Sequence, residues 1–187
     1  MRTLTLLACL ALVPTLAIAA PANAPDPAPP AALRVDLELD PLAYAFDGFS
    51  LHVGLGWDHY RLDLGTFAAR LPAFASQDGF DASFSGFGLK LDHVGRPDGM
   101  GLALGLEAAL LHERVERPDT GRGQTDLGAT LGARIGYRLP LGEHFFVLPW
   151  VGAGVHLGPE AVVLDGATYD RARFYVFPTV HLGYRLP

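Results

Sequence analysis

The residues of this chain best suited to covalent chemistry are a serine and a histidine two positions apart, Ser50 and His52. They lie in a stretch that alternates apolar and polar residues, so strand geometry makes their side chains neighbours on one face. A serine becomes a nucleophile when a nearby histidine takes its proton and an acid orients that histidine. Glu107 and Glu38 are the available acids. The spacing therefore allows a hydrolase centre, which we write as Ser50, His52 and Glu107.

The seven histidines do not predict a metal site. No two of them stand two residues apart, and the H-E-x-x-H arrangement of zinc enzymes is missing from the sequence. The glycine-rich run at 152–154 falls inside a predicted strand, whereas phosphate-binding glycines precede a helix. We therefore expect neither a metal ion nor an organic cofactor.

Period-2 alternation from Leu33 to the end of the chain indicates strands that must position these residues. The apolar phase slips after Pro41, which suggests a bulge, and again between Trp57 and Tyr60, which suggests a tight hairpin. With that hairpin the chain has eight predicted strands, at 33–46, 49–57, 60–67, 80–94, 100–116, 126–139, 145–157 and 171–186.

The predicted connections alternate in length. Short turns fall at 58–59, 95–99 and 140–144, and longer polar loops at 68–79, 117–125 and 158–170. Because the strand number is even, both ends of the barrel chain lie on the short-turn side. Short turns on one side and longer loops on the other are typical of bacterial outer-membrane barrels.

The polar phase of the strands predicts a crowded barrel interior. It is rich in glycine, which is disfavoured on an exposed strand face but leaves room for long side chains inside a narrow barrel. It also carries charges of both signs, which need partners when buried. The predicted polar network of the lumen consists of Arg34, Asp36, Glu38, Arg61, Asp63, Lys90, Asp92, Glu107, Arg134, Arg138, His156, His181 and Arg185. Together with Trp150 these long side chains should plug an eight-stranded lumen.

Aromatic residues concentrate near both ends of the predicted strands, as at the two interfaces of a membrane. The short-turn set is Trp57, Tyr60, Tyr137, Phe145 and Tyr184, and the other set is Phe46, Phe49, Phe67, Phe80 and Phe174.

The first residues read as a targeting segment. A basic start, an apolar core and an A-x-A site predict a secretory signal peptide at 1–19, followed by a proline-rich linker at 20–32 and a barrel at 33–187. After the first twenty residues no apolar run approaches the length of a membrane-spanning helix. The net charge of −6 argues against nucleic acid as a partner.

The signal peptide, the eight alternating segments and the last strand at 177–186 resemble the small eight-stranded outer-membrane β-barrel class. The resemblance implies export to the outer membrane, contact with outer-membrane lipid and lipopolysaccharide, and insertion by the barrel-assembly machinery. Members of the class usually end on an aromatic residue that this machinery reads, where the present chain has Leu186 followed by Pro187. Some members modify lipid A with a serine, a histidine and a carboxylate.

These observations predict an all-β protein, a closed eight-stranded antiparallel up-and-down transmembrane β-barrel. We expect a monomer with a plugged polar lumen and a structural or interaction role. Two alternatives stay open. One is an outer-membrane lipid-modifying hydrolase or acyltransferase, although serine and histidine in a polar lumen are more often only hydrogen-bond partners. The other is a soluble periplasmic barrel that holds an apolar ligand.

Overall fold

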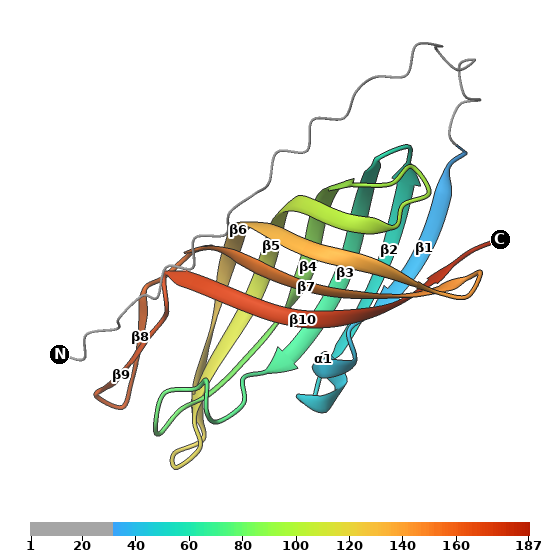
Figure 1. Cartoon of the computed structure of the whole chain (residues 1–187). Helices are drawn as coiled ribbons and strands as arrows, with labels where there is room; N and C mark the ends of the chain where they lie inside the picture. Colours follow the sequence, from blue (N-terminus) through green and yellow to red (C-terminus); the bar gives the residue numbers. More distant parts are fainter. Residues whose placement is uncertain (1–31) are drawn as a thin grey trace, which may run out of the picture.

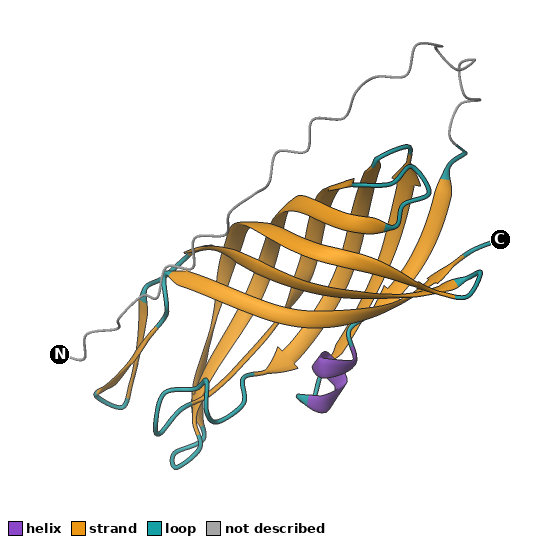
Figure 2. Ribbon diagram, in the orientation of Figure 1, coloured by secondary structure: helices purple, strands orange, loops and turns teal. Residues whose placement is uncertain are grey.

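The computed structural model describes residues 32–187, which form a closed barrel of eight antiparallel strands (Figures 1 and 2). The signal peptide predicted at 1–19 and nearly all of the predicted linker lie outside the described residues. Around the ring the strands are β1 (Arg34–Leu39), β2 (Phe49–Trp57), β3 (Tyr60–Arg70), β4 (Asp81–Val94), β5 (Gly101–Arg117), β6 (Arg122–Leu141), β7 (Phe145–Leu157) and β10 (Phe174–Arg185).

Each ring strand pairs with its neighbours along the chain, and β10 pairs with β1 to close the ring. The predicted closed, up-and-down antiparallel barrel is therefore confirmed. Both ends of the described chain lie at the end of the barrel that carries the short turns (Figure 1). No helix within residues 32–187 is long and apolar enough to cross a membrane.

The first strand is shorter than predicted. Instead of a bulged strand over 33–46, β1 ends at Leu39 and the helix α1 (Pro41–Ala45) follows. Asp40 begins this helix, because its carboxylate accepts a hydrogen bond from the backbone N–H of Leu42 at 2.8 Å. Proline at the first helical position is compatible with such a start. The phase slip after Pro41 thus marks a helical turn, and the prediction of a bulge there was wrong.

The loop predicted at 158–170 contains a second, two-stranded sheet. β8 (Ala161–Leu164) and β9 (Ala167–Asp170) form a hairpin whose turn residues Asp165 and Gly166 have φ values of 50° and 78°. Positive φ at both central residues is the requirement of a type I′ turn, which Asp-Gly satisfies well. We call this element the outer hairpin.

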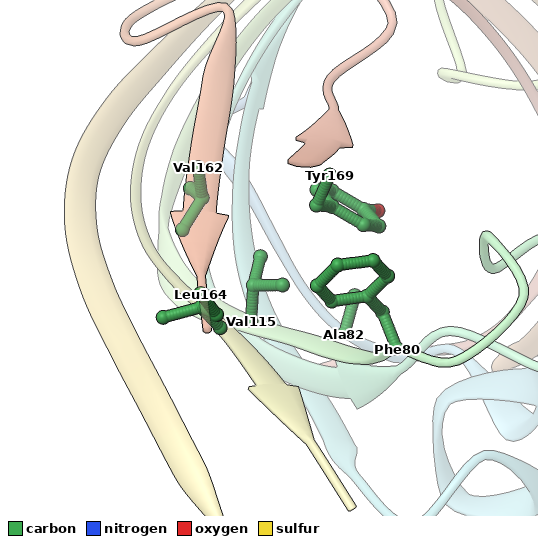
Figure 3. Close-up of a cluster of buried hydrophobic side chains, with 6 residues drawn as sticks. All are labelled: Phe80, Ala82, Val115, Val162, Leu164 and Tyr169. Atoms are coloured by element: carbon green, nitrogen blue, oxygen red, sulfur yellow. The ribbon is translucent and has the colours of Figure 1, made fainter. Parts of the chain in front are cut away.

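The outer hairpin packs on the long-loop ends of β4 and β5 (Figure 3). Gln77 fastens it from the neighbouring loop, since its amide donates to the carbonyl of Thr168 at 2.8 Å and accepts from the N–H of Asp170 at 3.0 Å. The hairpin buries its inner side chains in an apolar cluster of Phe80, Ala82, Val115, Val162, Leu164 and Tyr169. Burial there raises the pKa of the Tyr169 hydroxyl.

The turn between β5 and β6 is tighter than the predicted loop at 117–125, because the two strands pair as far as Arg117 and Arg122. In this turn the Arg117 guanidinium donates to the carboxylate of Asp119 at 3.0 Å. That hydrogen bond lowers the pKa of the Asp119 carboxyl, which therefore stays ionised at neutral pH.

Candidate functional site

Burial in this barrel is inverted with respect to a soluble protein. The side chains turned inward include charged residues with almost no exposure, such as Arg138 at 0%, Asp63 at 0% and Asp36 at 2%. The alternate positions on the same strands carry large apolar side chains that are exposed, such as Ile135 at 47% on β6, Leu64 at 54% on β3 and Leu37 at 45% on β1. The interior is polar, and the outside is apolar.

Arg61 of β3 is the centre of the interior network. Its guanidinium lies 2.8 Å from Glu38, 3.0 Å from Asp63, 3.4 Å from Asp36 and 3.7 Å from Asp92. These four carboxylates come from β1, β3 and β4, so one buried cation joins three strands through their inward faces. A buried charge is tolerated when it is paired and hydrogen-bonded in this way.

Arg138 of β6 completes the network on the opposite wall. It donates to Asp36 at 2.6 Å and to Glu38 at 2.9 Å, although about a hundred residues separate the partners. Its guanidinium also stacks on the ring of Phe146, 3.9 Å from the centroid. Arg185, near the end of β10, adds a contact of 3.2 Å to Asp36. The carboxylates of β1 are thereby held from across the lumen.

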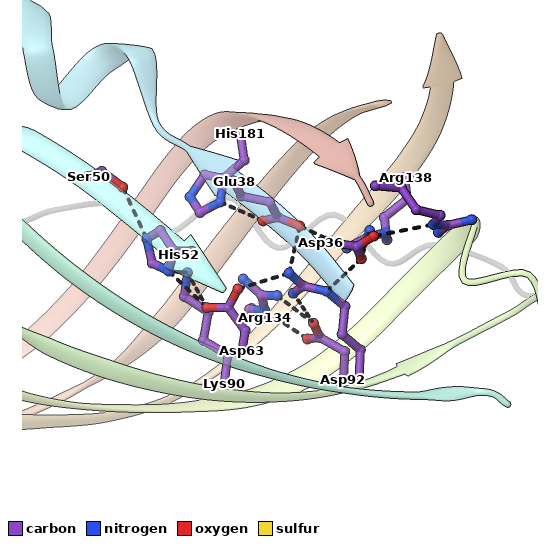
Figure 4. Close-up of polar contacts among 12 residues, drawn as sticks. Asp36, Glu38, Ser50, His52, Asp63, Lys90, Asp92, Arg134, Arg138 and His181 are labelled. Carbon is purple, nitrogen blue, oxygen red and sulfur yellow. Dashed lines mark hydrogen bonds and ion pairs between the residues drawn. The ribbon is translucent and has the colours of Figure 1, made fainter. Parts of the chain in front are cut away.

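A second buried pair lies beside this centre (Figure 4). Arg134 donates two hydrogen bonds to the carboxylate of Asp92, at 2.8 and 2.5 Å. Its guanidinium lies 5.1 Å from the ring centroid of Trp150. Lys90 lies 3.4 Å from Asp63 and 5.2 Å from the same Trp150 ring. Both cations therefore lie within cation–π distance of the same indole ring.

Two glycines show how tightly this interior is filled. A Cβ on Gly54 would stand 2.1 Å from the Arg61 guanidinium, and one on Gly65 would stand 2.0 Å from the ring of His52. Larger residues at these positions would force the buried side chains to shift. The glycine-rich polar phase thus corresponds to close approach of long side chains from neighbouring strands.

Ser50, His52 and Asp63 form a hydrogen-bonded chain within the lumen (Figure 4). The Ser50 hydroxyl lies 3.0 Å from Nε2 of His52, and Nδ1 of His52 lies 2.8 Å from Oδ1 of Asp63. This is the connectivity of a serine nucleophile, a histidine base and an orienting carboxylate. In the tautomer whose Nδ1–H donates to Asp63, Nε2 accepts from Ser50. A hydrogen bond from Lys90, whose Nζ lies 3.4 Å from Nδ1, would need the other tautomer.

The acid named from the sequence occupies a different place. Glu107 accepts a hydrogen bond from the hydroxyl of Tyr175 at 2.9 Å, and Asp63 takes the position beside His52. The reason is the register of the β2–β3 hairpin, which pairs His52 with Gly65 and Gly54 with Asp63. Asp63 is therefore a diagonal neighbour of His52 on the inward face. The predicted triad is therefore corrected, because Asp63 and not Glu107 is the carboxylate beside His52.

The remaining predicted site residues fall into separate groups. His181 joins the centre, with Nδ1 at 2.9 Å from Glu38 and its ring 4.9 Å from that of His52. Arg34 lies at the short-turn rim, where it donates to the backbone carbonyls of Pro97 and Asp58.

His156 lies toward the long-loop end, away from the central network. It contacts Glu113 at 3.0 Å, and Arg171 bridges Glu113 at 3.2 Å and Asp126 at 2.8 Å. Glu113, Asp126 and Arg171 are not among the residues predicted for the polar network. Glu113 shares the inward phase of β5 with Glu107, which is a signal that could have identified it.

The predicted outward position of the aromatic residues holds better at the short-turn end of the barrel than at the long-loop end. At the short-turn end Trp57 and Tyr60 are exposed and stack at 6.2 Å. At the other end Phe174 is exposed as expected. Phe80, however, is buried under the outer hairpin, and Phe67 has the inward phase of β3 and packs on Phe84 at 6.1 Å. Phe67 and Phe80 therefore do not belong to an outward-facing belt.

Within residues 32–187 the structure brings together no group of three or more histidine, cysteine, aspartate or glutamate side chains able to hold a metal ion. The chemistry that the described residues can support is that of buried ion pairs and of the serine–histidine–aspartate chain.

Comparison with known proteins gives a distant structural likeness. No protein-family model matches the chain, and no curated protein matches it in sequence. A solved structure similar to it is the N-terminal β-barrel domain of Pseudomonas aeruginosa OprF, with 16% identity over 82% of this chain and 96% of that one, at a TM-score of 0.42. The chain is accordingly classified by its own strand topology, as a closed eight-stranded antiparallel β-barrel.

Proposed function

We propose that this protein is an integral outer-membrane β-barrel, a monomer whose lumen is plugged by ion pairs and whose role is structural or one of interaction at the cell envelope. The observation that carries the proposal is the inverted burial. A large apolar surface in contact with water is unfavourable for a monomeric soluble protein. Lipid satisfies the same surface at no such cost, while the charges are paired inside.

The height of the apolar surface supports a membrane location. On β5 the outward residues Leu102, Leu104, Leu106 and Leu110 are all exposed. Eight residue steps of about 3.4 Å give roughly 27 Å along the strand, or about 21 Å along the barrel axis at a tilt near 40°. This is close to the apolar band of about 25 Å in outer-membrane barrels. Exposed Trp57 and Tyr60 suit the interface at the short-turn end.

The soluble alternative fits the burial less well. A soluble barrel that holds an apolar ligand turns its apolar residues inward and its charges toward water. Here the inward positions carry Arg61, Lys90 and Asp92, all nearly fully buried. The same side chains support a plugged lumen, because an eight-stranded barrel is only wide enough for its side chains to fill.

Partners follow from this location. We propose contact with outer-membrane lipid and lipopolysaccharide along the apolar surface, and insertion by the barrel-assembly machinery. Nucleic acid is not among the proposed partners, because the chain carries a net charge of −6.

Single cysteine variants test the location and orientation, after replacement of Cys9, the one cysteine of the sequence. We choose V163C on the outer hairpin, E143C in the turn between β6 and β7, and L106C in the middle of the apolar surface. A membrane-impermeant maleimide should label V163C on intact cells and E143C only after the outer membrane is opened. L106C should resist labelling until the barrel is unfolded.

Labelling of L106C as fast as E143C in the folded protein would contradict the proposal, because water would then reach the apolar surface. Fractionation and heat-modifiable migration on detergent gels provide the control that each variant is folded. The plugged lumen is tested separately in planar bilayers, where the folded barrel should show no sustained unitary current. A stable open conductance would refute the plug while leaving the membrane location intact.

A further inference from the structure

The short-turn mouth of the lumen brings together two arginines from the strands that close the ring. Arg34 is the first residue of β1, and Arg185 is the last residue of β10. Both have the inward phase, because each stands an even number of residues from a buried lumen residue, Asp36 in β1 and His181 in β10. We call Arg34 and Arg185 the rim arginines.

The rim arginines are neighbours in space. Gly99, in the turn between β4 and β5, lies beside both of them. A Cβ on Gly99 would stand 3.1 Å from Nη2 of Arg185 and 3.2 Å from Nε of Arg34, so the two nitrogens are no further apart than these two distances together. Two guanidinium charges at such a separation repel each other, and an anion beside them removes the repulsion.

Arg34 has no carboxylate of its own. Its guanidinium donates to the backbone carbonyls of Pro97 and Asp58, in two of the short turns, and it forms no ion pair with any carboxylate of residues 32–187. The Asp98 carboxylate in the nearer turn is already bonded to Arg96, and that of Asp58 is 59% exposed to water. The charge of Arg34 therefore remains available to a ligand.

Arg185 shares its carboxylate with two other arginines. It lies 3.2 Å from Asp36, which also accepts from Arg138 at 2.6 Å and lies 3.4 Å from Arg61. One buried carboxylate thus serves three guanidinium groups. Positive charge consequently exceeds negative charge around Asp36, at the end of the lumen where Arg34 adds a further cation.

Donors without acceptors mark the same region. Nη2 of Arg185, the nitrogen that faces Gly99, is buried and has no hydrogen-bond partner among the described residues. The same holds for Nε of Arg138, whose side chain is fully buried. Throughout residues 32–187, every buried side-chain polar atom that lacks a partner is a nitrogen donor. Since an unpaired buried donor is costly, an acceptor that carries negative charge would be stabilising here.

We propose that the rim arginines bind a phosphate group at the short-turn mouth of the lumen. The planar guanidinium fork matches the oxygens of phosphate, and a phosphate carries enough oxygens and charge to serve two guanidinium groups at once. Two sources supply this chemistry, namely inorganic phosphate and the headgroup of a phospholipid. The site itself does not depend on the proposed membrane location, and only the headgroup source rests on it.

A bound phosphate would join the first strand of the barrel to the last. β1 and β10 share only four residue pairs, so this is the shortest pairing in the ring. A ligand that binds the folded barrel and not the unfolded chain stabilises the fold. Phosphate at the rim arginines therefore links the stability of ring closure to the phosphate concentration on the short-turn side.

The test uses the full-length protein refolded in micelles of an uncharged detergent, at an ionic strength held constant with chloride. In the first arm inorganic phosphate is titrated and its binding is followed by ³¹P NMR. In the second arm phosphatidylglycerol is added to the micelles and its ³¹P signal is followed. The variants are R34Q and R185Q. R114Q is the matched control, because it removes a half-exposed arginine at the long-loop end.

We expect saturable binding of one phosphate per barrel. R34Q and R185Q should each weaken binding about 10- to 100-fold, since each removes charge-assisted hydrogen bonds to the ligand. R114Q should bind as tightly as wild type. Binding in the first arm identifies inorganic phosphate as a ligand, whereas a response in the second arm alone identifies the lipid headgroup.

Urea unfolding provides a second readout. If inorganic phosphate binds, each tenfold rise in its concentration above saturation should lower the unfolding equilibrium constant of wild type about tenfold. R34Q and R185Q should show only the general stabilisation that phosphate exerts as an excluded salt. R114Q should follow wild type.

Heat-modifiable migration confirms that each variant is folded. A folded wild-type barrel that binds phosphate in neither arm would overturn the proposal, and so would binding of equal strength by wild type, R34Q and R185Q. Phosphate bound at the rim arginines by a protein that fractionates outside the membrane would uphold the site and refute only the membrane location.

Discussion

The Arg134–Asp92 pair offers a quantitative test of whether the lumen excludes water. Arg134 grips Asp92 through two hydrogen bonds, and both side chains are at most 3% exposed. The nearest other cation to Asp92 is Arg61, at 3.7 Å. Arg134→Met keeps an unbranched apolar stem but removes the guanidinium and its charge, so Asp92 would be left buried with one long contact, to Arg61.

Breaking a buried ion pair by removing one partner costs about 3–5 kcal/mol, because an uncompensated charge remains. An exposed pair contributes only about 0–1 kcal/mol. Arg114→Met is the matched control, since Arg114 pairs with Glu116 at 2.8 Å and is half exposed. We therefore expect Arg134→Met to lower the free energy of unfolding by about 3–5 kcal/mol, and Arg114→Met by about 1 kcal/mol at most.

The assay is urea unfolding of the barrel refolded into lipid vesicles, followed by circular dichroism and by the folded fraction on unheated gels. A double variant, Arg134→Met with Asp92→Leu, should recover much of the loss because it leaves no unpaired charge. Equal and small losses in Arg134→Met and Arg114→Met would refute the reasoning. Such losses would mean that water screens the interior charges. The proposal of a plugged lumen would then be wrong as well.

Three further predictions concern the wall, the packing and the outer hairpin. Leu106→Arg places a charge on the outward face and should cost about 2–4 kcal/mol for folding into vesicles, whereas an unchanged free energy would argue against lipid contact. Gly183→Ala brings a Cβ within 2.0 Å of the Phe146 ring and should cost about 1–3 kcal/mol by urea titration, and a neutral effect would show that the ring has room to move. Val162→Asp buries a charge under the outer hairpin and should make the hairpin sensitive to protease, while migration of the barrel stays heat-modifiable. Loss of the folded barrel in this variant would show that the hairpin is not a separate unit.

The strands of the ring could be predicted from the sequence because their two faces differ along almost the whole chain. The alternation of Leu102, Leu104 and Leu106 with small or charged residues leaves only one way to orient β5. The prediction of a bulged strand in the region of α1 was wrong because Leu42, Tyr44 and Phe46 continue a period-2 pattern. The competing signal was present, since an aspartate before a proline begins a helix well.

The candidate site was only half predictable, for a geometric reason. Neighbours along one strand, such as Ser50 and His52, follow from period 2 alone. Asp63 follows only after the two-residue turn has fixed the register of the β2–β3 hairpin. The position of Glu107 depends on how far β3, β4 and β5 are staggered around the ring, and side-chain patterns do not determine this shear.

The short pairing of β1 with β10 has a consequence for the order of assembly. Only four residue pairs close the ring there, and Asp36 meets Arg185 across 149 positions of sequence. Contacts of such separation form late, because the intervening chain must already be arranged. The carboxylates of Asp36 and Glu38 find Arg61 and Arg138 only when β1 is docked in register. A slip of one residue would turn both charges to the outer face of the barrel, so the ion pairs act as a check that the ring has closed correctly.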